Sequence, residues 1–204
     1  RFKMKKIYIL ALIVTVFGLT ASAQNDFTAS TATAKNEYKA GNLEEARFAL
    51  QQSLAEVDKE IGREILGILP KSIAGFSFVE ANDNVSGNSS SFGGLFVHRD
   101  YGDTTKSVAI DLMDNSPMLA GINSLLAMPM IMNSSDGSQK VIKVSGYKAL
   151  LQRKDAAQAV GGYTLQIPFN QSLFTVDFDG AFTESEVTSA ANAMPISEVA
   201  KLTY

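Results

Sequence analysis

Two neighbouring segments near the C-terminus alternate between apolar and other residues, and this period of two constrains the fold more than any other feature. Residues 163–169 carry Tyr, Leu, Ile and Phe at every second position, and residues 174–178 repeat the pattern after the link Asn170-Gln171-Ser172. Because successive side chains of a strand point to opposite faces, each segment can bury one face. The pair therefore predicts two antiparallel strands joined by a tight turn.

Similar short apolar patterns upstream predict the remainder of one antiparallel sheet with about six to seven strands. A Ser/Asn/Gly-rich stretch at residues 82–94 is typical of a loop. The further strands are expected at residues 76–78, 95–97, 108–112, 142–144 and 147–151.

Helical periodicity dominates residues 28–69, broken once at Ala40-Gly41-Asn42, so two helices are expected before Pro70. Further helical segments are expected at residues 117–128 and 184–194, the second being a C-terminal helix. Strands and helices do not alternate, which predicts an α+β fold: a helical hairpin followed by an antiparallel sheet with flanking helices. In the second helix, one apolar stripe is formed by Leu43, Ala46, Leu50, Leu54, Val57, Ile61, Ile65 and Ile68.

Residues 34–46 resemble the helix–turn–helix of a tetratricopeptide repeat in their small, aromatic and glycine positions. One copy cannot build a stacked array, so the resemblance implies a hairpin packed on the downstream domain. The order of elements after Pro70 resembles the sheet-and-helix sandwich of the PsbP and Mog1-like group. That group hosts unrelated roles, so the resemblance implies a fold and no active site. The expected domains are residues 24–70 and 71–204.

Residues 4–23 have the pattern of a bacterial secretory signal, preceded by three upstream residues, 1–3. A charged start and an apolar run from Ile7 to Leu19 lead to Ala21-Ser22-Ala23 ahead of Gln24. Thirteen apolar residues are too few for a membrane span, which needs about 20. We expect cleavage near Ala23, a periplasmic or secreted product, and membrane contact only during export.

Composition excludes several classes of function. Loss of residues 1–23 leaves 14 basic against 21 acidic residues, a net charge of −7, which argues against nucleic acid as a partner. The chain has no cysteine, and His98 is its one histidine. Thiol catalysis, thiolate zinc sites and multi-histidine centres are thereby excluded within one chain, and no cofactor is predicted.

One segment matches a calcium-binding loop in part. Residues 175–186 place oxygen side chains near the EF-hand positions, with Asp177, Asp179 and Glu186 as the carboxylates. The first ligand position holds Thr175 in place of a carboxylate, and the preceding segment alternates like a strand. A turn at Asp179-Gly180, followed by a capping box of Thr183 and Glu186, explains the same residues.

Five methionines fall between Met113 and Met132. Flexible thioethers pack cores or line adaptable contact surfaces, and they also suit Cu(I), with His98 as a further candidate ligand. We interpret this Met-rich segment as a surface for an envelope protein or a small apolar ligand. Its residues are Met113, Met118, Ile122, Leu125, Met128, Met130 and Met132.

The chain contains the residue types of a hydrolytic triad but not the sequence motif of a known one. His98 with Asp100 or Asp103 and one serine of Ser89-Ser90-Ser91 supplies a base, an orienting acid and a nucleophile, but no Gly-x-Ser-x-Gly elbow is present. The sequence therefore favours a non-catalytic exported binding or assembly protein acting through residues 113–132. Metal binding and hydrolysis are the alternatives.

Overall fold

The computed structural model describes residues 18–87, 94–128, 137–154 and 161–203, with side chains from Asp26 onward. It confirms the predicted α+β fold, with two N-terminal helices, a seven-stranded antiparallel sheet and flanking helices. The chain divides into two compact units, residues 1–57 and 58–204. The division falls inside the second helix, so the last turns of that helix belong with the sheet.

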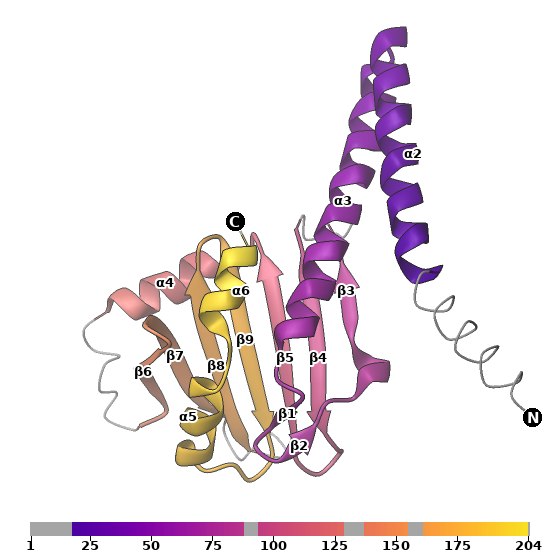
Figure 1. The fold of residues 1–204 in the computed structure, drawn as a ribbon. Coiled ribbons are helices and arrows are strands. Elements are labelled where there is room, and N and C mark those ends of the chain that lie inside the picture. Colours follow the sequence, from indigo (N-terminus) through magenta and orange to yellow (C-terminus); the bar gives the residue numbers. More distant parts are fainter. Residues whose placement is uncertain (1–17, 88–93, 129–136, 155–160, 204) are drawn as a thin grey trace, which may run out of the picture. The chain divides into compact units, whose positions relative to one another are not determined.

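The first unit is a helical hairpin. Helix α2 (Gly18–Ala40) and the first part of α3 (Leu43–Ile68) run antiparallel (Figure 1). Gly41 takes the left-handed φ of +84° at the predicted break, and the Asn42 amide then donates to the Glu37 carbonyl. This conformation suits a glycine after a helix C-terminus, so the chain reverses where the sequence predicts.

The second unit contains the sheet, whose strand order is β3-β4-β5-β9-β8-β7-β6, with every neighbouring pair antiparallel. A separate two-stranded hairpin, β1–β2, lies before it in the chain. After the end of α3, the elements are β1 (Ser72–Ile73), β2 (Phe76–Ser77), η1 (Glu80–Asn82), β3 (Asn84–Ser86), β4 (Phe96–Gly102), β5 (Ser107–Asp114), α4 (Leu119–Ala127), β6 (Gln139–Val144), β7 (Tyr147–Lys154), β8 (Gly162–Phe169), β9 (Ser172–Asp179), α5 (Glu184–Asn192) and α6 (Ile196–Leu202).

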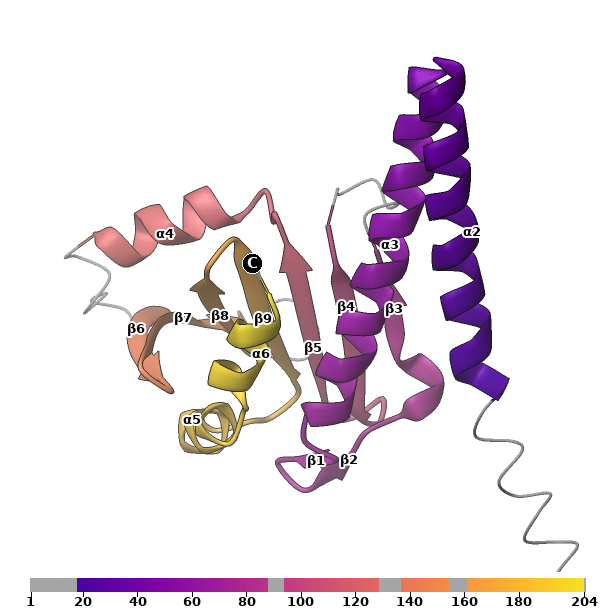
Figure 2. The same cartoon turned by 45° about the horizontal axis from the view of Figure 1, so that its top comes forward.

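One face of the sheet carries the main core. Alternate residues of the central strands pack with the last turns of α3 and with α5 and α6. Figure 2 shows these helices over one face of the sheet. Val187, Ile196 and Val199 contribute the helical side of this core. The sheet side comes from Val97, Tyr101, Val108, Ile110, Leu112, Leu151, Leu165, Ile167, Phe174, Val176 and Phe178.

The opposite face is covered near one end by α4. Ile122 and Leu126 of this helix pack on Leu150 and Leu173, which point away from the main core. Away from α4, the strands present polar side chains on this face, the alternation expected of an antiparallel sheet that is solvated on one side.

Polar contacts fix the end of α3 to β4. The buried Arg99 guanidinium donates to both carboxylate oxygens of Asp83, at 2.8 and 2.5 Å, and to the Leu66 carbonyl at 2.8 Å. It also lies 4.4 Å from the centre of the Phe78 ring. The Tyr101 hydroxyl donates to the Pro70 carbonyl at 2.8 Å. These bonds set where the chain leaves the helix and enters the sheet.

Two local features differ from the sequence-based expectation. The stretch expected to be a loop at residues 82–94 contains β3, which pairs with β4 at one edge of the sheet. The expected strand at residues 76–78 is reduced to the two residues of β2, although Phe78 also forms a bridge to Tyr101. Strand β2 pairs with β1, and β3 pairs with β4. Strands of two or three residues are too short to show a period of two in the sequence.

Candidate functional site

The Met-rich segment runs from the end of β5 through α4. Met113 is half-buried on the face of the sheet that bears α4, Leu125 is half-buried, and Ile122 is buried. Met118 and Met128 stand at the two ends of α4 and are 54% and 50% exposed. Met130 and Met132 lie outside the described residues. The structure therefore separates the predicted residues into a buried helix face and two exposed ends.

A shallow hollow lies beside α4. Its volume is about 260 Å³, and its lining comes from Asn123, Leu126, Ala127, Lys148 and Pro168. Ligand pockets for drug-sized molecules are mostly apolar, with volumes of about 300–1,000 Å³. This hollow is smaller and includes a lysine, so it offers poor enclosure to an apolar molecule.

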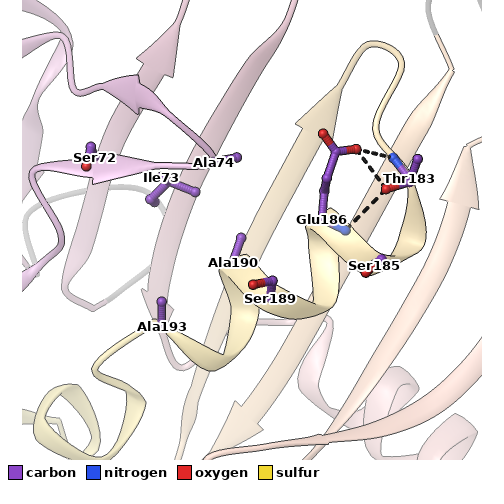
Figure 3. Close-up of a pocket in the computed structure, with 9 residues that line it drawn as sticks. All are labelled: Ser72, Ile73, Ala74, Thr183, Ser185, Glu186, Ser189, Ala190 and Ala193. Carbon is purple, nitrogen blue, oxygen red and sulfur yellow. Dashed lines mark hydrogen bonds between the residues drawn. The ribbon is translucent and has the colours of Figure 1, made fainter.

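A larger hollow separates the β1–β2 hairpin from α5 (Figure 3). Its volume is about 450 Å³, and small or hydroxyl-bearing side chains line most of it. The carboxylate of Glu186 accepts bonds from the Thr183 amide and hydroxyl, at 2.7 and 2.8 Å, and from Lys106 at 3.2 Å. These bonds lower the pKa of Glu186 to about 2, the backbone bond from Thr183 contributing most. The acid is thus committed to capping α5.

The three carboxylates of the proposed calcium loop have other partners. Asp177 and Asp179 lie on the same face of β9, and Lys154 donates to them at 2.9 and 2.7 Å. Thr164 also donates to Asp177, at 2.6 Å, while Glu186 completes the capping box predicted from the sequence. Within the described ranges, no three His, Asp or Glu side chains converge as a metal site would require.

His98 lies on β4 between two carboxylates. Its Nδ1 is 2.7 Å from Asp111 and its Nε2 is 3.2 Å from Asp100, whose carboxylate also accepts a bond from Asn82. Burial by itself lowers the pKa of His98, but the bonds and charges of Asp111 and Asp100 outweigh it and raise the pKa above 6.5. Both ring nitrogens are engaged, so this histidine is poorly placed to accept a proton from a nucleophile.

The other members of the hydrolytic hypothesis are not brought to His98. Asp103 accepts bonds from the Thr105 and Lys106 amides in the β4–β5 turn. Ser89, Ser90 and Ser91 lie outside the described residues.

The helical hairpin leaves exposed part of the apolar stripe that the sequence predicts on the second helix. Leu43, Leu50, Leu54 and Val57, called here the hairpin stripe, are between 37% and 63% exposed. Ten large apolar side chains are exposed in the described chain, and seven of them belong to residues 27–57. These seven are the four residues of the hairpin stripe together with Phe27, Tyr38 and Phe48.

Helix α2 covers a different side of α3. Ala46, Ala49 and Ser53 are buried, and the Ser53 and Ser30 hydroxyls lie 2.8 Å apart. Small residues here let the two helices approach closely. A signal for the exposed stripe was present in the composition of α2, because residues 24–40 contain Phe27 and Tyr38 but no leucine, isoleucine, valine or methionine that could cover it.

No protein-family model, curated protein or solved structure matches this chain. None of the described helices is both long and apolar enough to span a bilayer.

Proposed function

We propose that this protein is a non-catalytic, exported binding protein that docks a protein partner through the hairpin stripe. One observation carries the proposal: Leu43, Leu50, Leu54 and Val57 form a row on α3 that α2 leaves uncovered. Contiguous exposed apolar surface on a soluble protein marks an interaction site, whereas single exposed residues do not.

The form of this surface favours a protein over a small ligand. The stripe is about 21 Å long at 1.5 Å per residue, and it is convex because it lies on a helix. The hollows at α4 and α5 are open and partly polar. A convex apolar row gains most from a partner that lies along it, such as another helix.

The export part of the proposal rests on residues 4–23. Their charged start, short apolar run and Ala21-Ser22-Ala23 exit have the order of a cleaved secretory signal. The absence of cysteine and the acidic balance of the remaining chain are compatible with a periplasmic or secreted protein whose stability comes from packing.

Cysteine labelling tests this function directly, since the natural chain has no cysteine. Leu54→Cys and Met118→Cys place single thiols at two positions that are both 54% exposed, one on the stripe and one at α4. A thiol reagent is applied to producing cells and, separately, to each purified variant at high dilution. We expect slower labelling of Leu54→Cys in cells than in the diluted protein, and equal labelling of Met118→Cys in both.

The opposite pattern assigns the docking surface elsewhere. Protection of Met118→Cys alone makes α4 the contact surface and overturns the assignment to the hairpin. Equal labelling of both variants in cells and in dilution contradicts docking at either place.

A further inference from the structure

We infer that the occupant of the hairpin stripe is the stripe of a second copy of this chain, in an antiparallel two-fold pair. The inference rests on the proposed function and names the partner for the same surface. It starts from the spacing of the four residues, which are separated by seven, four and three positions along α3. A repeat close to 3.5 residues is the pattern by which helices pack along a seam.

Three of the four stripe residues are arranged symmetrically about Leu50. Leu43 and Val57 lie seven residues on either side of it, so an antiparallel copy places Leu43 of each chain beside Val57 of the other. Leu50 then meets its own symmetry mate on the axis. A two-fold interface requires such a match, because the same patch contacts itself in reverse order.

The stripe also continues an interface that the helix already makes. Farther along α3, Ile61 and Ile65 continue the same apolar repeat and pack on the sheet core. One apolar row thus serves the core at its C-terminal end and is exposed from Leu43 to Val57. A second copy gives the exposed part the helix packing that its repeat predicts.

The mass of the purified full chain in solution tests the inference. Sedimentation equilibrium of the form yielded by an exporting host is expected to give twice the chain mass, falling to the single mass on dilution. Leu50→Glu places two carboxylates together on the axis, and we expect it to weaken the dimer by more than about a hundredfold. Since Leu50 is exposed in the single chain, the circular dichroism of Leu50→Glu should match that of the wild type, and so should its melting temperature at dilutions where both chains are monomeric.

Met118→Glu is the matched control, because it places the same charge at a similarly exposed apolar residue outside the hairpin. It should leave the dimer intact. Leu50→Cys adds a second test, since mild oxidation should link two copies through this residue, whereas Met118→Cys should remain unlinked.

A chain that stays monomeric at every concentration, or a dimer that Leu50→Glu does not weaken, overturns the inference. The proposed function has a separate outcome. Protection of Leu54→Cys in cells together with a monomer in solution means that the stripe docks a different protein.

Discussion

At the scale of single residues, the buried Arg99 and the half-buried His98 form hydrogen bonds and ion pairs that stabilise the fold. Arg99 is committed to Asp83 and to the Leu66 carbonyl, and His98 is committed to Asp111 and Asp100. A residue composition with one histidine allowed a hydrolytic hypothesis, but composition does not say which partners a side chain finds in space. The register of β4 with β5, which places His98 opposite Asp111, supplies that information.

Removal of Asp83 should destabilise the protein strongly, because it leaves the Arg99 guanidinium buried without its carboxylate. We expect Asp83→Ala to lower the free energy of unfolding by about 3 kcal/mol in urea titrations. The exposed pair of Arg63 and Glu60 provides the control, and Glu60→Ala should cost less than about 0.5 kcal/mol. Adding Arg99→Met to Asp83→Ala should recover most of the loss. Equal costs for the two alanine variants would refute the structural role of this pair.

The pH dependence of stability should report the contacts of His98. Its pKa is raised in the folded protein, so the protonated ring stabilises the fold. This stabilisation is complete below pH 6.5, the unfolded value, and is lost as the pH rises through the higher folded pKa. Urea titrations from pH 5.5 to 8.5 should therefore show a stability difference between wild type and His98→Gln that shrinks with pH. A difference that grows with pH would have the wrong sign for this account.

At the scale of elements, periodicity predicted which residues share a face but not what covers each face. The alternation in β8 and β9 located both strands, because burial on one side of a sheet leaves a period of two in the sequence. The capping box of Thr183 and Glu186 located the start of α5. Strand β3 escaped prediction because its three residues are held by pairing with β4 and carry no apolar repeat.

The same argument explains the hairpin stripe. A repeat from Leu43 to Ile68 appears as one continuous apolar face in the sequence. In the structure α2 packs on a neighbouring side of α3, where Ala46 and Ala49 are buried, and the sheet core accepts Ile65. A helix pattern cannot show where along its length the covering element ends.

Two glycines of α3 provide a test of how closely this helix packs on the sheet unit. A Cβ added at Gly62 would lie 2.3 Å from Val85 and 3.1 Å from Leu95, whereas a Cβ at Gly67 meets nothing within 4 Å. Valine is stiff at its branched carbon, so it yields poorly to such a contact. We expect Gly62→Ala to lower the unfolding free energy by about 1–3 kcal/mol, and Gly67→Ala to raise it by up to about 1 kcal/mol.

Thermal or urea unfolding of both variants measures this difference. The sign for Gly62→Ala is the informative result, because helix propensity alone favours alanine at both positions. Stabilisation by both substitutions would mean that α3 does not pack on β3 at this distance.

At the scale of the whole molecule, the chain combines two different units. The sheet unit buries its apolar residues in a core, whereas the hairpin leaves several large apolar side chains exposed. The sheet unit has helices on one face and α4 on the other. In the hairpin, α2 packs on one side of α3, and the hairpin stripe of α3 stays exposed. This contrast is why we assign binding to the hairpin.

Export should be visible as a change in chain length. The protein purified from an exporting bacterial host should have the mass of a chain that begins at Gln24. Ala21→Lys, at the −3 position of the cleavage site, should block this shortening, since that position requires a small residue. Ala29→Lys, beyond the site, should leave it unchanged. Retention of residues 4–23 in the wild-type product would contradict the export assignment.

Photo-crosslinking in producing cells tests the central claim most directly. A photoreactive amino acid is placed at Leu54 on the stripe or at Met118 on α4, and the adducts are identified by mass spectrometry. We predict one discrete adduct from position 54, with the mass of two cross-linked copies of the chain. We predict no adduct from position 118. An adduct confined to position 118, or no discrete adduct from position 54, would contradict docking through the hairpin stripe.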